Sequence, residues 1–376
     1  MANEEIKKVK KVSGGKKEST AKKSQTKSKP SAATGKTAAT KTTKKETASK
    51  TVATKKIVAD KTAVEVKPVT RAENELKIDY EIAFKPSVLF VASEANPFAG
   101  TGGLADVIGS LPKTLAQNGN YDVRVAIPLY GSVSPAYRAM MRFEGNFNVP
   151  VAWRNQYCGL FSLKYEGVTF YFIDNEYYFK RDNLYGYFDD GERFAFFSRA
   201  VLEAMRYMDY YPSVLHCHDW QTALSVIYLK TIYSEIKGFS SVRALFTIHN
   251  IEYQGKYGHE LLQDLFGLPE SCRQIVDYDG CINLMKGAIQ LAERFSTVSR
   301  TYAGEIKNPF FAHGLEYMST ANEYKLSGIL NGIDEVLYNP ENDDKIFAKY
   351  TADDLTGKAV SKEELQKMLA LPIKKD

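Results

Sequence analysis

The stretch SEANPFAGTGGLADVIGSLPKTL, residues 93–115, decides the fold. It follows the apolar run SVLFVAS, residues 87–93, which is typical of a strand buried on both faces of a parallel sheet. A glycine-rich turn comes next, and a helix is predicted from about residue 103 to 117. Such a turn usually holds an anion at the N-terminus of the helix. However, no Lys or Arg lies between Ser93 and Asp106, so the cation that usually accompanies a phosphate is missing.

Strands and helices continue to alternate along the chain. Residues 158–174 alternate in polarity around Glu166-Gly167 and predict a β-hairpin. The whole pattern predicts an α/β fold with a doubly wound, Rossmann-like parallel sheet. The other predicted elements are strands over 122–129, 213–219, 243–250, 296–299 and 326–334 (a strand and turn), and helices over 192–208, 221–236 and 282–295.

The N-terminal residues differ in composition from the rest of the chain. Residues 1–71 carry 19 Lys and one Arg against six acidic residues, a net charge of +14, whereas the whole chain carries +5. No aromatic residue precedes Tyr80, and Lys, Ala and Thr dominate, so residues 1–79 are predicted to be disordered. This tail either contacts a polyanion such as nucleic acid or is solvated without a partner. It resembles neither a signal peptide nor a transit peptide.

Composition also excludes several classes of protein. No run of 18 apolar residues exists, so no membrane span and no membrane partner are expected. The four cysteines contain no CxxC pair, which argues against a disulfide framework or a structural zinc site. A reduced, cytoplasmic protein is therefore expected.

Four motifs follow predicted strands, and the ligand crevice of a doubly wound sheet lies beyond the carboxyl ends of its strands. They offer glycines for close backbone approach, and His, Asn and Asp side chains for hydrogen bonds. His218 lies nearest the turn and is expected to reach the crevice, whereas His216 is expected to pack inside. The motifs are EANPFAGTGG (94–103), HCHDWQ (216–221), HNIEYQG (249–255) and NGID (331–334).

Each motif also has a plainer interpretation. The glycine turn could connect a strand and a helix without a ligand, and Asp106 could cap that helix. His216, His218 and Asp219 could bind a metal, although no second ligand cluster has the required spacing. Finally, the aromatic residues of segment 177–187 could stack on a sugar, but packing within the loop is the simpler expectation.

Taken in order, the long motifs of this chain resemble bacterial glycogen synthases and plant starch synthases. Besides those quoted above, they include DVRVAIPLYG, IDNEYYFKRDNLYGYFDDGERFAFFSRAVLE, INLMKGAIQLAERFSTVS and LSGILNGIDEVLYNP, and the similarity runs from about residue 85 to 372. The resemblance implies the N-terminal half of a GT-B glycosyltransferase. Such an enzyme transfers glucose from ADP-glucose to the non-reducing end of an α-1,4-glucan such as glycogen or starch, with retention and without a metal or other cofactor.

The resemblance also implies roles for individual residues. His218 would orient the transferred glucose, and Asp106 would contact the donor's nucleotide or sugar; these two are the expected catalytic residues. The other expected donor- or substrate-binding residues are Glu94, Gly100, Thr101, Gly102, Gly103, His249, Asn250 and Asn331.

Two departures from the family pattern stand out. Gly100 occupies the place of a lysine in the family motif Lys-Thr-Gly-Gly-Leu, so the turn keeps its shape and loses its charge. The expected domain, residues 80–340, is followed only by a linker and helix, residues 341–376, that lead to a second domain missing from this chain. The chain alone is therefore expected to be inactive. The alternatives are a non-catalytic, α-glucan-binding or regulatory homologue and a protein tethered to nucleic acid by its tail.

Overall fold

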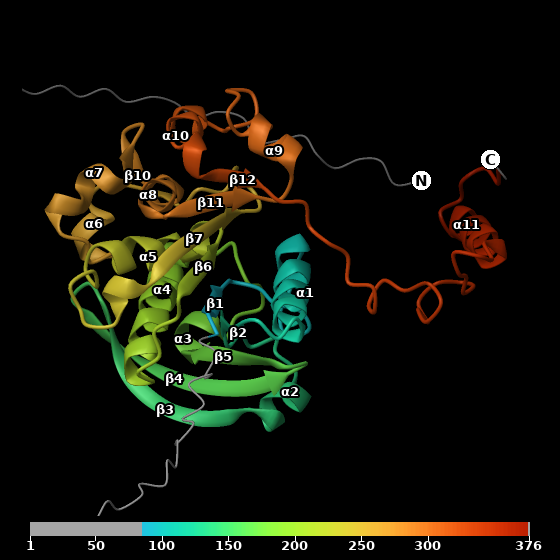
Figure 1. The fold of residues 1–376 in the computed structure, drawn as a ribbon, viewed down its shortest axis with the longest axis horizontal. Coiled ribbons are helices and arrows are strands. Elements are labelled where there is room, and N and C mark those ends of the chain that lie inside the picture. The colour runs from blue at the N-terminus through green and yellow to red at the C-terminus, as the bar shows by residue number, and fades with distance from the viewer. Residues whose placement is uncertain (1–84, 375–376) are drawn as a thin grey trace, which may run out of the picture. The chain divides into compact units, whose positions relative to one another are not determined.

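The computed structural model describes residues 85–374, so the predicted disordered tail lies outside the described residues (Figure 1). A nine-stranded sheet runs through this part of the chain in the order β12-β11-β7-β6-β1-β2-β5-β4-β3. Neighbouring strands are parallel from β12 to β5, whereas β4 and β3 pair antiparallel at one edge. The strands are β1 Ser87–Val91, β2 Asp122–Pro128, β3 Arg142–Val151, β4 Arg154–Tyr165, β5 Val168–Asp174, β6 Val214–His218, β7 Arg243–Ile248, β11 Arg294–Thr297 and β12 Leu326–Gly328.

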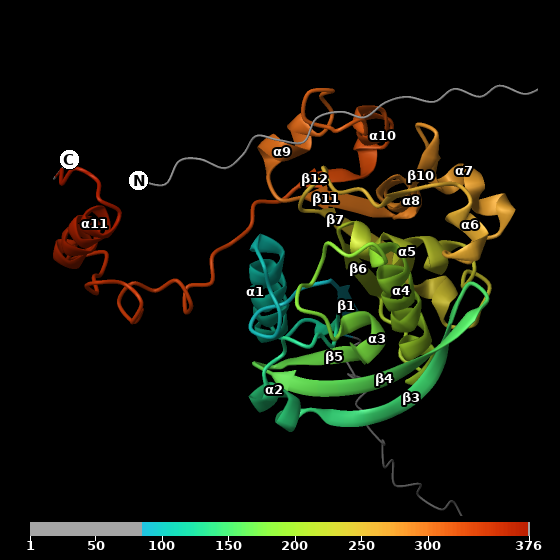
Figure 2. The same ribbon diagram turned by 180° about the vertical axis from the view of Figure 1, so that it is seen from behind.

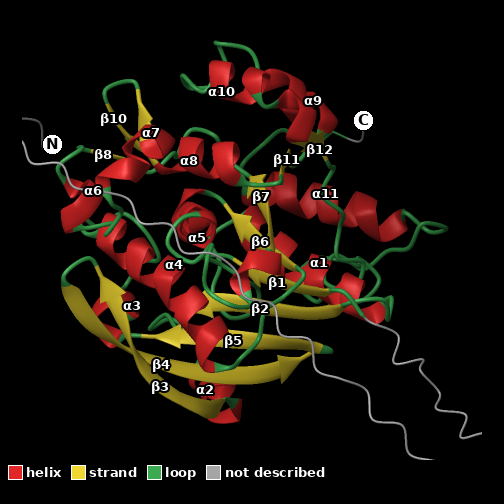
Figure 3. Ribbon diagram, turned by 60° about the vertical axis from the view of Figure 1, so that its left-hand side comes forward, coloured by secondary structure: helices red, strands yellow, loops and turns green. Residues whose placement is uncertain are grey.

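Helices cover both faces of this sheet. Figures 1 and 2 show α1 on one side of the central strands and α4 and α5 on the other, and Figure 3 shows the same arrangement from a third direction. The helices are α1 Gly103–Gln117, α2 Pro135–Met140, α3 Glu176–Phe179, α4 Asp190–Tyr207, α5 Trp220–Lys230, α6 Leu261–Asp264, α7 Arg273–Val276, α8 Leu284–Leu291, α9 Arg300–Glu305, α10 Glu316–Ala321 and α11 Thr356–Met368. A small second sheet contains β8 Lys256–Tyr257, β9 Asp277–Tyr278 and β10 Cys281–Asn283.

The predicted doubly wound fold is confirmed, with differences at some element ends. The helix expected over residues 282–295 covers only Leu284–Leu291. Its start is fixed by Asn283, whose side chain accepts a hydrogen bond from the Lys286 backbone N–H at 3.0 Å, while Cys281–Asn283 pair as strand β10. The helix predicted over residues 221–236 ends at Lys230. The antiparallel edge strand β3 was not predicted.

Helix α4 lies at the centre of the hydrophobic core. Most of its residues are buried, because the helix packs against strands β3, β4 and β5 of the sheet and against α5 beside it. Burying one phenylalanine side chain contributes about 1.5–3 kcal/mol, so the row Phe194, Phe196 and Phe197 is a major source of stability.

The four cysteines are free thiols. Within residues 85–374, no helix combines the length and apolar character that crossing a membrane requires.

The hairpin between β4 and β5 forms as the sequence predicts. Tyr165 pairs with Val168 across a two-residue loop. Both loop residues have positive φ, 47° for Glu166 and 86° for Gly167, as in the type I′ turns that suit the twist of paired strands. Gly167 is favoured here because an L-amino acid side chain is strained at this φ.

Replacing Gly167 tests this backbone requirement. A Cβ atom at residue 167 would meet no atom within 4 Å, so only the strained φ opposes a side chain. Gly167→Ala is expected to lower the free energy of unfolding by about 1–2 kcal/mol in urea titrations. The matched control is Gly304→Ala in α9, where a Cβ also meets open space and φ is not positive. That change should stabilise the protein by up to about 1 kcal/mol. Equal effects of the two substitutions would contradict the strain at Gly167.

Candidate functional site

The glycine turn after β1 is held in place by one buried carboxylate. Glu94 is almost inaccessible to solvent. It accepts hydrogen bonds from the Thr101 backbone N–H at 2.5 Å, from the Thr101 hydroxyl at 2.8 Å and from the Tyr185 hydroxyl at 2.7 Å. The carboxylate therefore connects the glycine turn to the loop before α4 through neutral donors.

Gly100 is required by the packing of this turn. A Cβ atom at residue 100 would lie 2.5 Å from the Cβ of Ala105 and 2.8 Å from the Asn96 Oδ1 atom. Both contacts are too close for any side chain unless the turn shifts. The turn therefore approaches α1 so closely at residue 100 that the lysine of the family pattern would not fit there.

Three imidazoles lie in a row behind the carboxyl ends of β6 and β7. The ring centroids of His216 and His218 are 4.1 Å apart, and those of His218 and His249 are 5.3 Å apart. The His216 Nε2 atom is bonded to the Thr247 hydroxyl at 2.7 Å, and the His218 Nδ1 atom lies 3.0 Å from the His249 Nε2 atom. In contrast, the buried His218 Nε2 atom has no hydrogen-bond partner among residues 85–374.

Burial keeps these imidazoles neutral at physiological pH. It lowers the pKa of His216 to about 3 and the pKa of His249 to about 4, and it holds the pKa of His218 well below its ordinary value. The row can therefore exchange hydrogen bonds with hydroxyl groups, but it supplies no positive charge for a phosphate.

Asp219 ties the ends of β6 and β7 together. Its backbone has a positive φ of 57°, and its carboxylate Oδ1 atom accepts hydrogen bonds from the backbone N–H groups of His249, at 2.7 Å, and Asn250, at 3.3 Å. Burial raises the pKa of Asp219 to about 7, although these two hydrogen bonds oppose the increase. The carboxyl group thus fixes the loop that carries His249 and Asn250.

A hollow of about 760 Å³ lies where the four strand-end motifs meet. It offers carboxylate, amide, hydroxyl and indole groups, and no lysine or arginine is among its lining residues. The N-terminus of α1 also faces it through Gly102, Gly103 and Leu104, which directs the positive end of the helix dipole toward the hollow. The lining residues are Glu94, Thr101, Gly102, Gly103, Leu104, Tyr185, Gly186, Asp190, Asp219, Trp220, Gln221, His249, Asn250, Tyr253, Val298 and Asn331.

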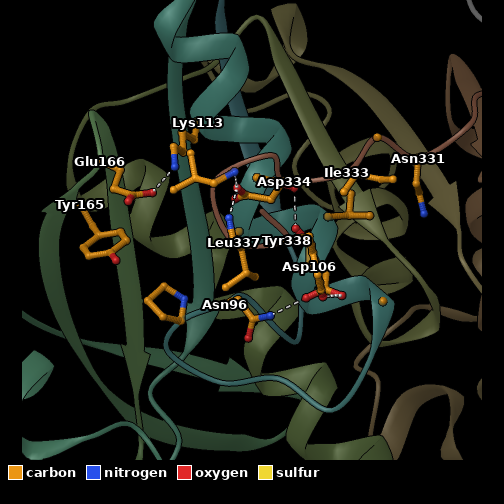
Figure 4. A pocket seen from close by; sticks show the side chains of 17 residues that line it. Asn96, Asp106, Lys113, Tyr165, Glu166, Asn331, Ile333, Asp334, Leu337 and Tyr338 are labelled. Carbon is orange, nitrogen blue, oxygen red and sulfur yellow. Dashed lines mark hydrogen bonds and ion pairs between the residues drawn. The ribbon is translucent and has the colours of Figure 1, made fainter. Parts of the chain in front are cut away.

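A second hollow of about 670 Å³ lies beside α1, between this helix and residues 331–338 (Figure 4). Figure 4 shows Asp106 between Asn96, whose Nδ2 atom donates a hydrogen bond at 2.7 Å, and Tyr338, whose hydroxyl donates at 3.1 Å. Lys113 also lines this second hollow, but its ammonium group is paired with Glu166 at 2.9 Å. Asp106 therefore faces a different hollow from the one that the four motifs share.

Comparisons with known proteins agree with the resemblance seen in the motifs. The profile of the starch synthase catalytic domain matches residues 87–320. Glycogen synthases from Desulforamulus reducens and Lactobacillus acidophilus are 45% and 47% identical to this chain over 291 and 289 residues, which is 77% and 76% of it. The chain belongs to the starch synthase catalytic domain family.

A solved structure supports the same assignment of the fold. The catalytic domain of starch synthase IV from Arabidopsis thaliana, bound to ADP and acarbose, matches with a TM-score of 0.68 and 32% sequence identity. That match covers 76% of this chain and 60% of the plant domain. The chain likewise spans 60% of the length of each of the two bacterial relatives. The large sheet is therefore that of a GT-B starch synthase domain.

The structure brings most of the residues expected from the family motifs to one place. Seven of them line the first hollow: Glu94, Thr101, Gly102, Gly103, His249, Asn250 and Asn331. Contrary to the expectation that it reaches the crevice, His218 lines neither hollow and has only 1% of its surface exposed, and Asp106 lines the second hollow. Gly100 is not among the residues that line either hollow.

Several lining residues were missed by sequence reasoning. Asp219, Trp220, Gln221 and Tyr253 stand within or directly beside the quoted motifs, so following each motif past the end of its strand would have found them. Tyr185 belongs to the aromatic segment 177–187, for which sugar stacking was the alternative to packing, whereas Asp190 is the first residue of α4 and nothing local in the sequence indicates that it faces the hollow. Within residues 85–374, no group of three or more His, Cys, Asp and Glu side chains is arranged to hold a metal.

The raised pKa of Asp219 predicts a pH dependence of definite sign. The folded-state pKa of about 7 exceeds the unfolded value near 4, so the contribution of Asp219 to stability is present at low pH and is lost as the pH rises through 7. Asparagine does not titrate. Asp219→Asn should therefore gain stability relative to the wild type, by about 2 kcal/mol between pH 5 and pH 8.

Urea unfolding of both proteins at four pH values between 5 and 8 measures this difference. The buried histidines titrate in both proteins, so their effect cancels in the comparison. A difference in unfolding free energy that is independent of pH would show that the carboxyl group of Asp219 has an ordinary pKa.

Proposed function

We propose that this chain forms the sugar-binding half of an ADP-glucose-dependent glycosyltransferase, which adds glucose to an α-1,4-glucan with retention. The relatives support this proposal because they are named glycogen synthases, and the similar plant domain was solved with ADP and acarbose bound. The observation that carries it is the first hollow, because its lining presents carboxylates, amides and hydroxyls and contains no lysine or arginine.

The chemistry of this hollow suits a sugar better than a diphosphate. The carboxyl groups of Asp190 and Asp219 accept hydrogen bonds from hydroxyl groups but supply no positive charge to phosphate oxygens. The backbone N–H groups at the start of α1 and the positive end of its dipole can still bind one edge of a phosphate group. We therefore place the glucose of the donor in the first hollow, and the cation that neutralises the departing diphosphate outside it.

His218 then has a specific role in this proposal. Its Nε2 atom is buried without a partner, and such an atom carries a desolvation cost unless a ligand bonds to it. We assign this nitrogen to a hydroxyl of the transferred glucose, which requires the His218 Nε2 atom to become accessible from the first hollow when the donor binds. The imidazole is neutral, so it orients the sugar without attracting the phosphates.

Comparing two ligands tests this role. His218→Asn is expected to weaken binding of ADP-glucose by about tenfold, which corresponds to the loss of one hydrogen bond of about 1.4 kcal/mol. Binding of ADP should stay within about twofold of the wild type, because ADP lacks the sugar. Isothermal titration calorimetry of both ligands measures the two affinities.

The matched control is His216→Asn. His216 is also buried in the imidazole row, but its Nε2 atom is already bonded to Thr247. This change should lower stability and leave both affinities nearly unchanged. The proposal would be contradicted if His218→Asn weakened binding of ADP and ADP-glucose equally, or if the wild type bound ADP-glucose no better than ADP.

A further inference from the structure

Phe188 is the most exposed large apolar side chain in residues 85–374, with its ring fully in solvent. It stands at the tip of the loop before α4. The same loop lines the first hollow through Tyr185, Gly186 and Asp190. Phe188 therefore lies, in sequence, two residues from lining residues on either side. The packing expected for the aromatic residues of segment 177–187 is confirmed for the buried Tyr178 and Phe179 but not for Tyr177, which is exposed.

The loop that exposes Phe188 is held in place by hydrogen bonds and an ion pair. The carboxylate of Asp190 accepts hydrogen bonds from the backbone N–H groups of Gly186, at 2.8 Å, and Tyr187, at 3.2 Å. The Asp190 backbone N–H is in turn bonded to the Tyr187 carbonyl at 3.0 Å. On the other side, Asp189 pairs with Arg181 at 2.8 Å. The backbone is thus fixed immediately before and after Phe188.

A buried arginine anchors this loop to the core. Arg193 has no solvent exposure, and its guanidinium group donates hydrogen bonds to the carbonyls of Tyr178, at 2.7 Å, and Leu184, at 3.1 Å. It also forms an ion pair with Asp190. A cation taken out of water is costly, so these contacts hold the loop in one conformation. The protein therefore presents an apolar ring to solvent on a rigid support.

The surroundings of Phe188 indicate what covers it. Exposed apolar surface that is fixed in place marks an interaction site. Phe188 is followed in the sequence by the charged residues Asp189 and Asp190, and Arg181 pairs with Asp189, so the exposed ring belongs to a segment rich in charge. A stable protein–protein interface buries more than about 1,000 Å² in total and needs a larger apolar centre. A sugar is a smaller occupant. One face of a pyranose ring presents C–H groups that suit the ring of Phe188, and the hydroxyls at its edge suit carboxylates such as those of Asp189 and Asp190.

We propose that Phe188 is the stacking platform of an acceptor subsite, on which a glucose unit of an α-1,4-glucan lies as the glucan enters the first hollow. This inference rests on the proposed function and adds a residue to it. The ring supplies apolar contact with the sugar face, while the hollow behind it receives the end of the glucan.

The test uses the 376-residue chain and maltoheptaose as the probe. Phe188→Ala should weaken binding of maltoheptaose about tenfold in calorimetric titrations, because the sugar loses its apolar platform. Phe188→Tyr and Phe188→Trp keep a flat ring and should stay within about threefold of the wild type. In native gels containing glycogen, the wild type, Phe188→Tyr and Phe188→Trp should be retarded more than Phe188→Ala. In gels containing dextran, an α-1,6-glucan, all four proteins should show little retardation.

The control variant is Phe143→Ala, which removes an exposed phenylalanine from β3 at the far edge of the sheet. It should leave maltoheptaose binding unchanged. Equal affinity of Phe188→Ala and the wild type, or equal losses at residues 143 and 188, would overturn the subsite while leaving the ADP-glucose proposal standing. No binding of maltoheptaose by the wild type would also overturn it. If Phe188→Ala instead dissociated a dimer in sedimentation experiments, the ring would contact a second copy of the chain and not a glucan.

Discussion

The buried carboxylate of Glu94 is the interaction on which the geometry of the site depends. It receives hydrogen bonds from two atoms of Thr101 in the glycine turn and from Tyr185 in the loop before α4. These segments are about 90 residues apart in the sequence and face the same hollow. A buried carboxylate without these donors would carry a large desolvation cost, so the two segments are held at a fixed separation. Phe188 and the start of α1 take their positions from this connection.

The first hollow has a glycine turn of the kind that usually binds phosphate, but no cation lines it. This combination explains how such a turn can serve a sugar site. Glycine gives the turn a close approach to α1, and Gly100 leaves no room there for a lysine side chain. The imidazoles behind the hollow are kept neutral by burial, and the carboxylates favour hydroxyl groups. Each of these features makes the hollow more suitable for a sugar than for a diphosphate. In the proposed function, the groups that position the sugar are therefore separate from the cation that neutralises the diphosphate.

Much of the fold follows from local patterns. The apolar run before the glycine turn predicted β1, and the Glu166-Gly167 pair predicted the hairpin, because both depend on residues that are neighbours in sequence. The meeting of four motifs at one edge followed from the rule for parallel strands. Contacts between segments that are distant in the sequence could not be predicted from local patterns. The positive φ of Asp219 is stabilised by backbone N–H groups 30 residues later, and the burial of Arg193 depends on carbonyls of another loop. An arginine in a helix is usually exposed, so its role as an anchor is visible only in the structure.

Saturation-transfer difference NMR of ADP-glucose with this chain tests most directly whether the first hollow binds sugar. The account predicts that the hexose protons receive the strongest saturation and that the adenine H2 and H8 protons receive clearly less, because the sugar lies among Asp219, His249 and Asn250 while the nucleotide points outward. Strong saturation of the adenine protons with little effect on the hexose would contradict the account, since the hollow would then bind the nucleotide.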